Sequence, residues 1–109
     1  MTAIADLVRL YFRAYETADR SAMEPLIAEG FRFKSPFDDN IDRATYFERC
    51  WPHAGGRRFD ILTLFSEGNE ALIRYECTWD DGRTHRCTEF FRSDGEKIEY
   101  VDVYFGFKV

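Results

Sequence analysis

Three ionisable residues in the second half of this 109-residue chain give its clearest chemical signal. Arg74 and Glu76 are two residues apart, so they share a face of any strand that contains them, and Glu89 lies on the next alternating segment. Two carboxyls beside one guanidinium leave an excess negative charge in an apolar site, which favours a raised pKa for one of them. A carboxyl that stays protonated can donate to a carbonyl or epoxide oxygen, so the cluster predicts acid–base chemistry, with Arg74 orienting the ligand. The alternative is a structural ion network that fixes the strands.

The convergence of this trio depends on two tight turns. If Gly68–Asn69 is a two-residue turn, Thr63 lies opposite Arg74. If Asp81–Gly82 is another, Arg74 lies opposite Glu89, and opposed residues have Cβ atoms about 5 Å apart on one face. A single bulge would move every residue beyond it to the other face.

The remaining sequence predicts the elements that position these residues. Apolar residues at helical spacing predict a helix over 3–18, a second short helix follows Asp19, and Asp42 is expected to cap a third over 43–51. The segment 31–36 alternates like a strand, and from Arg58 the period becomes two. Helices followed by an antiparallel meander predict an α+β fold, with the helices on one side of the sheet. The four strands of the meander are expected at 58–66, 70–80, 83–92 and 97–107.

Both faces of the expected meander are apolar. One face should meet the helices and enclose a pocket, and the other should meet a second subunit in a homodimer. The turns place on the inner face Phe59, Ile61, Thr63, Phe65, Leu72, Arg74, Glu76, His85, Cys87, Glu89 and Phe91. They place on the outer face Leu62, Leu64, Ile73, Tyr75, Trp79 and Phe90.

Charge and composition exclude several classes of partner. The chain carries 20 acidic and 15 basic residues, a net charge of -5, with no basic run, so neither nucleic acid nor an anionic membrane is expected as a partner. No apolar stretch is long enough to span a bilayer, and Asp6 and Arg9 interrupt the N-terminal apolar segment. Three cysteines are too few for a disulfide framework, which predicts a cytoplasmic location. His85 and Cys87 share a face without further ligands, so no metal site is expected.

Several short motifs occur in a familiar order. They are Tyr11 followed by Asp19, the Phe-Lys-Ser-Pro-Phe segment at 33–37, Asp-Gly-Arg at 81–83, Thr-Glu-Phe-Phe at 88–91 and Val-Tyr-Phe-Gly at 103–106. Together they resemble the SnoaL-like branch of the nuclear transport factor 2-like superfamily, which includes ketosteroid isomerases and limonene-epoxide hydrolases. The resemblance covers the single domain 1–109. It implies three helices on a curved antiparallel sheet, a cone-shaped internal pocket for a small apolar ligand and a dimer through the outer sheet face.

The resemblance also assigns site residues. Tyr11 matches the tyrosine that hydrogen-bonds the substrate carbonyl in ketosteroid isomerases. Glu89 lies at or near the acid of their oxyanion hole, with Phe91 as the competing alignment. Ser35 stands where their base carboxylate should be, and a hydroxyl cannot replace it unaided. Arg74 and Glu76 resemble part of the catalytic trio of the epoxide hydrolases, whose second acid is replaced by Gly106.

We therefore expect Glu76, Arg74, Glu89 and Tyr11 to be the catalytic residues of an isomerase, hydrolase or cyclase type of activity. No nucleotide loop or cofactor fingerprint occurs in the sequence, so no cofactor is expected. A non-catalytic ligand-binding or protein-interaction module is the alternative. If the turn at 93–95 contains a bulge, Asp102 faces outward and the pocket is lined by Tyr15, Phe33, Ser35, Trp51, Phe59, Ile61, His85, Cys87, Val101, Val103 and Phe105.

Overall fold

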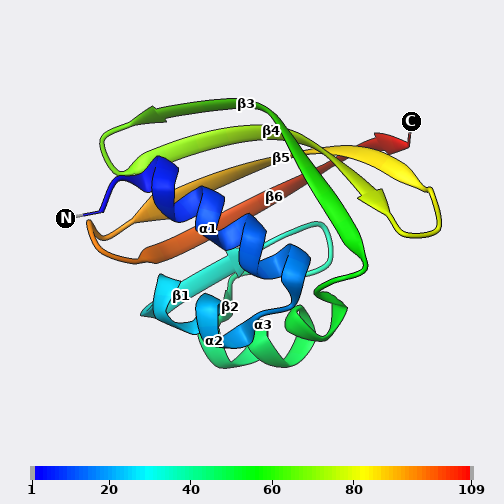
Figure 1. The fold of residues 1–109 in the computed structure, drawn as a ribbon. Coiled ribbons are helices and arrows are strands. Elements are labelled where there is room, and N and C mark those ends of the chain that lie inside the picture. Colours follow the sequence, from blue (N-terminus) through cyan, green and yellow to red (C-terminus); the bar gives the residue numbers. More distant parts are fainter. Residues whose placement is uncertain (1, 109) are drawn as a thin grey trace.

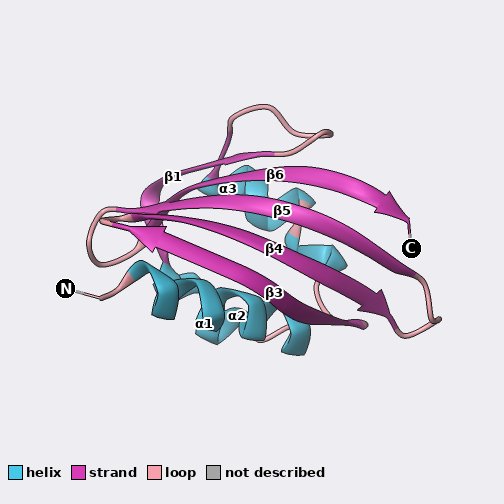
Figure 2. Ribbon diagram, turned by 90° about the horizontal axis from the view of Figure 1, so that it is seen from above, coloured by secondary structure: helices cyan, strands magenta, loops and turns pink. Residues whose placement is uncertain are grey.

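A curved sheet wraps around the N-terminal helix in the computed structural model, which describes residues 2–108 (Figure 1). Viewed from above, the strands form one layer and the helices lie beneath it (Figure 2). The predicted α+β fold is confirmed. The helices are α1 (Ile4–Thr17), α2 (Arg20–Met23) and α3 (Arg43–Arg49), with 3-10 turns η1 (Glu24–Leu26) and η2 (Trp51–His53). The strands are β1 (Ile27–Lys34), β2 (Ile41–Asp42), β3 (Arg57–Glu67), β4 (Glu70–Trp79), β5 (Thr84–Ser93) and β6 (Ile98–Lys108).

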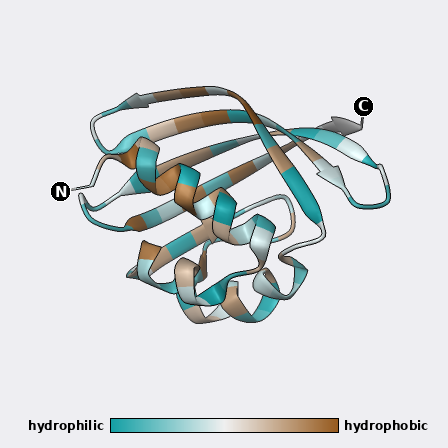
Figure 3. Ribbon diagram, viewed as in Figure 1, coloured by the Kyte–Doolittle hydropathy of each residue, from teal (hydrophilic) through white to brown (hydrophobic). Residues whose placement is uncertain are grey.

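The helices form where capping and apolar spacing predict them. The buried stripe of α1 faces the sheet, and its apolar positions are visible as brown segments between teal ones (Figure 3). The Asp19 carboxylate accepts a hydrogen bond from the Ala22 amide at 3.2 Å and caps α2. The Asp42 carboxylate accepts one from the Thr45 amide at 2.9 Å and caps α3. Because Pro52 cannot continue an α-helix, α3 stops at Arg49 and the chain passes into η2.

The sheet has the order β2-β1-β6-β5-β4-β3 among the described residues. Four strands form the predicted antiparallel meander, but β1 pairs in parallel with β6, with Phe33 opposite Val101. The prediction of an antiparallel sheet therefore holds for the meander and not for this edge. In this sheet β1 lies side by side with the last strand, β6, and runs in the same direction (Figure 2).

Two local irregularities change the predicted faces. Thr63 lies opposite Arg74 as expected, but a bulge between Ile61 and Thr63 sets Ile61 opposite Tyr75. The β4–β5 loop is one residue longer than predicted, because the Trp79 amide donates to the Arg83 carbonyl at 2.8 Å and residues 80–82 form the turn. An odd loop length shifts the pairing by one position and therefore exchanges the faces.

The outcome is a concave face different from the predicted one. Glu89 lies opposite Ile73, and Arg74 lies opposite Thr88 on the convex face. Five residues that were predicted to face inward share the convex face instead: Thr63, Phe65, Leu72, Arg74 and Glu76. Four residues that were predicted on the outer face lie on the concave face instead: Leu64, Ile73, Tyr75 and Trp79. Phe90 keeps its predicted convex position, opposite Leu72.

Candidate functional site

A cavity of about 420 Å³ opens between α1, the concave face of the sheet and the segment 35–53. This volume is within the range of small-molecule sites. Most of its lining is aromatic, and its polar groups are few. The lining residues are Tyr11, Phe12, Tyr15, Phe33, Ser35, Phe37, Asp38, Tyr46, Arg49, Cys50, His53, Arg57, Phe59, Tyr75, Trp79, Glu89, Val103 and Phe105.

Glu89 is the buried acid of this cavity. Its position on β5 opposite Ile73 and Val103 aims it at the concave face, and only 4% of the residue is exposed. Burial raises the pKa of Glu89 to about 7, although a hydrogen bond with Tyr75 and the positive charge of Arg57 both lower it. The side chain is therefore divided between its acid and base forms near neutral pH, the condition that general acid–base catalysis requires.

Phenol groups form the wall beside α1. The Tyr11 and Tyr46 hydroxyls lie 2.7 Å apart and share a hydrogen bond, and the Tyr15 hydroxyl donates to the Cys50 carbonyl at 2.9 Å. Burial raises the pKa of Tyr11, Tyr15 and Tyr46, so all three remain protonated. Of the three, only the phenol that accepts in the Tyr11–Tyr46 hydrogen bond keeps an O–H free to donate to a ligand oxygen, and none of them is a base at neutral pH.

A second acid of the cavity is held by an ion pair. Asp38 follows β1, and its carboxylate lies 2.9 Å from an Arg49 guanidinium nitrogen on α3. The Ser35 hydroxyl donates to the same carboxylate at 3.3 Å. Burial and Asp38 raise the pKa of the Cys50 thiol to about 12, so Cys50 is not a thiolate nucleophile.

Arg57, at the start of β3, is surrounded by aromatic rings. Its guanidinium carbon is 3.9 Å from the Trp79 ring centroid, 5.1 Å from that of Tyr15 and 5.7 Å from that of Phe59. Its Nη2 donates to the His53 carbonyl oxygen. The buried Nε has no hydrogen-bond partner in the part of the chain that the structure describes. Cation–π attraction thus holds the Arg57 guanidinium in place, although not all of its N–H groups have hydrogen-bond partners.

Comparison with known proteins identifies the family. The model of the SnoaL-like domain matches residues 8–101. The chain belongs to this SnoaL-like family. A comparison with curated proteins finds no match.

Solved structures share the fold of this SnoaL-like chain. A nuclear transport factor 2-like protein of unknown function from Cytophaga hutchinsonii is 21% identical, with a TM-score of 0.81 over 96% of this chain and 91% of that chain. A putative ketosteroid isomerase from Kribbella flavida is 18% identical, with a TM-score of 0.82 over 95% and 78%. An LEH-like epoxide hydrolase from M. tuberculosis is 12% identical, with a TM-score of 0.77 over 94% and 81%.

The cavity of the SnoaL-like domain brings together many residues that the sequence predicted for it. Glu89 and Tyr11 both line it, together with Tyr15, Tyr46 and Tyr75. Of the predicted lining residues, it includes Tyr15, Phe33, Ser35, Phe59, Val103 and Phe105. Asp102 faces outward as expected and accepts hydrogen bonds from the Tyr100 and Tyr104 hydroxyls.

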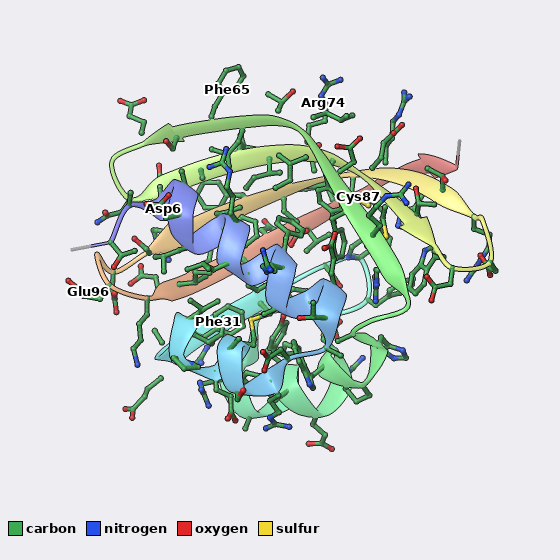
Figure 4. The ribbon with its side chains drawn as sticks, viewed as in Figure 1. Asp6, Phe31, Phe65, Arg74, Cys87 and Glu96 are labelled. Carbon is green, nitrogen blue, oxygen red and sulfur yellow. The ribbon has the colours of Figure 1, made fainter. Side chains whose placement is uncertain are left out.

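Arg74 and Glu76 do not lie in the cavity. The Arg74 Nη2 donates to the Thr63 hydroxyl at 3.0 Å, and Glu76 pairs with Arg86 at 2.9 Å. Figure 4 shows Arg74, with Phe65, above the strands and away from α1. The prediction that both residues converge on Glu89 inside the cone is wrong, because the longer β4–β5 loop puts them on the convex face.

Five other predicted lining residues lie outside the cavity wall. Trp51 packs against Tyr15, with ring centroids 5.5 Å apart, and the His85 ring is tilted against that of Trp79 at 6.3 Å. Burial, then Arg57 and Arg83, lower the pKa of His85. The other three pack within or against the hydrophobic core: Ile61, Cys87 and Val101.

Sequence reasoning missed the cation and part of the aromatic wall. Arg57 stands one residue before the expected strand, and no sequence signal separates it from Arg58. Tyr75 and Trp79 were assigned to the outer face by the turn arithmetic. Asp38 was not among the predicted lining residues, and the sequence holds no signal that distinguishes it from its neighbour Asp39.

Two further properties follow from the described residues. Within residues 2–108, no three His, Cys, Asp or Glu side chains gather in a way that could hold a metal ion. No helix in that range is long and apolar enough to cross a membrane.

Proposed function

We propose that this SnoaL-like protein binds a small, largely apolar molecule in its cavity and that Glu89 transfers a proton to or from that molecule. The observation that carries this proposal is a carboxyl buried at the wall of an aromatic cavity, without a bound cation to neutralise it among the described residues. Such a group is expensive to keep unless it has a use. The names of the fold relatives, an isomerase and an epoxide hydrolase, are compatible with chemistry of this class.

The proposed chemistry follows from the two forms of Glu89. The protonated form donates to a carbonyl or epoxide oxygen, and the ionised form accepts a proton from carbon or water. Tyr75 lines the cavity beside Glu89, and its hydroxyl favours the ionised form of the carboxyl. The hydrogen-bonded Tyr11–Tyr46 pair keeps one free O–H along the same wall, which suits a ligand oxygen that gains negative charge.

Replacement of Glu89 by Gln tests this proposal. A β,γ-unsaturated cyclohexenone and styrene oxide serve as probes of isomerase and hydrolase activity, and their products are followed by absorbance and chromatography. We expect Glu89→Gln to lower kcat/KM for the active probe by about 100-fold or more, the typical contribution of a general acid or base. The wild-type pH profile should show an inflection near 7, the pKa of Glu89.

Glu76→Gln is the matched control, because it makes the same change on the convex face. It should leave turnover at the wild-type rate. Equal turnover by Glu89→Gln and wild type would contradict the catalytic role. Probe binding without turnover would favour the non-catalytic ligand-binding alternative.

We also propose that the protein is a homodimer through the convex sheet face and that it resides in the cytoplasm. Exposed apolar side chains on that face support the first proposal: Phe65, Leu72 and Tyr104 are 74%, 48% and 60% exposed. The free thiols of Cys50, Cys77 and Cys87 support the second, because a reducing compartment maintains thiols.

A further inference from the structure

We propose that Arg57 binds a carboxylate of the ligand, so that the cavity selects apolar monocarboxylic acids. This inference deepens the proposed function and rests on it, since the same cavity must hold the ligand. It assigns the two ends of the bound molecule: the acid group lies at Arg57, and the apolar body extends along the aromatic wall toward Glu89.

The charges that line the cavity lead to this assignment. Asp38 and Arg49 neutralise one another at 2.9 Å. Glu89 is buried and forms no ion pair with the side chains described over residues 2–106, and the same holds for Arg57. While Glu89 is protonated, the cavity therefore contains one positive charge, that of Arg57, without a balancing carboxylate. Once Glu89 ionises, its charge lies in the field of Arg57 and opposes the binding of a further anion.

The surroundings of Arg57 are those of an anion-binding group rather than of a solvated surface arginine. Trp79, Tyr15 and Phe59 surround the guanidinium and restrict its movement, with the Trp79 centroid at 3.9 Å. The His53 carbonyl fixes one nitrogen. A guanidinium has five N–H donors, and a carboxylate can accept two of them in a planar pair. An orientation fixed in advance lowers the entropy lost on binding.

Charge balance favours a carboxylate over a phosphate. One unpaired cation matches one negative charge, whereas a phosphate monoester carries about 1.5 to 2 negative charges at pH 7. The extra charge would be placed among aromatic rings, where burial of an unpaired charge is costly. The rest of the lining supplies few other polar contacts, so the remainder of the molecule should be apolar.

Matched probes test the assignment. The probes are 2-naphthoate, 2-naphthamide, which has nearly the same shape without the charge, and 2-naphthyl phosphate. Affinities are measured by calorimetry at pH 6, where naphthoate is ionised and Glu89 is mostly protonated, for the wild type, Arg57→Gln, Arg57→Lys and Arg58→Gln. Arg58 is the control, because it is the exposed neighbour in sequence and does not line the cavity.

For the wild type we expect naphthoate to bind at least tenfold more tightly than naphthamide and than naphthyl phosphate. Arg57→Gln should lose the preference for naphthoate over naphthamide while keeping its affinity for naphthamide within about threefold. Arg57→Lys should keep part of the preference, and Arg58→Gln should match the wild type. The ¹⁵N resonance of Arg57 Nε in the wild type should shift on titration with naphthoate and remain unchanged with naphthamide, which tests the contact even if a variant fails to fold.

Several results would overturn the assignment. Equal affinity of the wild type for naphthoate and naphthamide, or an unchanged preference in Arg57→Gln, would do so and leave the proton-transfer role of Glu89 standing. Tighter binding of naphthyl phosphate would replace the carboxylate by a phosphate. Absence of binding by every probe at millimolar concentration would overturn both the assignment and the proposed ligand cavity. Conversely, a confirmed carboxylate preference with full turnover in Glu89→Gln would overturn the catalytic proposal alone.

Discussion

Glu89 owes its altered acidity to burial rather than to a neighbouring acid. The sequence placed two carboxyls side by side, where like charge would raise one pKa. In the structure Glu76 is on the other face, paired with Arg86. Desolvation alone raises the pKa of Glu89, and Tyr75 and Arg57 reduce the effect. Arg57 therefore links the two ends of the cavity: an anion bound beside it would cancel its field and raise the pKa of Glu89 further.

A raised carboxyl pKa makes the stability of the fold depend on pH. Below the ordinary glutamate value of 4.5 the side chain is neutral in both folded and unfolded states. As pH rises from 4.5 through about 7 the unfolded chain releases the proton first, so the folded state loses relative stability. We expect the free energy of unfolding of the wild type to fall by up to about 3 kcal/mol relative to Glu89→Gln across this window.

Urea denaturation at several pH values between 4 and 8 measures this difference. Glu76→Gln should retain the slope of the wild type, because its carboxyl is partly exposed and paired at the surface. Parallel stability curves for the wild type and Glu89→Gln would show that Glu89 is ionised at its ordinary pKa.

At the scale of the elements, amphipathic period and turn residues predicted most helices and strands but not their faces. The strands of the meander begin and end within two residues of their expected limits. The faces depend on whether a loop or strand contains an extra residue. Asp81–Gly82 has the composition of a two-residue turn, yet the loop also includes Asp80, with Gly82 at a φ of 92°. The hydrophobic pattern predicts neither the inclusion of Asp80 in the loop nor the bulge near Leu62, because both faces of the strands are apolar.

The exchange of strand faces also explains which of the predicted site residues lie in the cavity. Glu89, Tyr11 and Phe59 were placed in the cavity correctly. Arg74 and Glu76 were misplaced because the extra residue of the β4–β5 loop reverses the face of β4 relative to β5, so that Glu89 lies opposite Ile73 and not opposite Arg74. The parallel contact of β1 with β6 is a long-range pairing, and local patterns do not encode it.

Gly106, which replaces an acid of the epoxide hydrolases in the sequence comparison, has a structural role at the β5–β6 pairing. A Cβ at this position would lie 2.2 Å from the Arg86 carbonyl oxygen and 2.9 Å from its carbon. Backbone atoms cannot move aside without disturbing the ladder. We expect Gly106→Ala to lower the free energy of unfolding by about 2 kcal/mol or more, as overpacking does.

Gly30→Ala in β1 is the control, since a Cβ there meets nothing within 4 Å. It should leave stability unchanged or slightly increased, because alanine reduces the entropy of the unfolded chain. Thermal unfolding of both variants tests the difference. Equal melting temperatures for Gly106→Ala and the wild type would mean that this end of β6 relaxes freely.

At the scale of the whole molecule, the curved sheet has two faces with different tasks. The concave face holds α1, the core and the cavity. The convex face combines apolar side chains with charged ones: Leu72 lies opposite Phe90 near one end, and Glu76 pairs with Arg86 toward the other. Apolar contacts beside charged ones resemble the core and rim of a protein interface. Arg74 and Glu76, predicted as catalytic residues, are accordingly better placed to border an interface than to reach a ligand.

A twofold dimer through this convex face would cover the exposed apolar side chains of both copies. We expect the wild type to sediment at about twice its monomer mass of 12.9 kDa at micromolar concentration. The double substitution of Phe65 and Leu72 by Lys should weaken the dimer at least tenfold, because it buries two charges against their symmetry mates. Leu10→Lys is the control, since Leu10 is 50% exposed and belongs to α1, the helix that the concave side of the sheet wraps around. A wild type that sediments as a monomer at these concentrations, or a double variant that remains dimeric, would show that the convex face has another use.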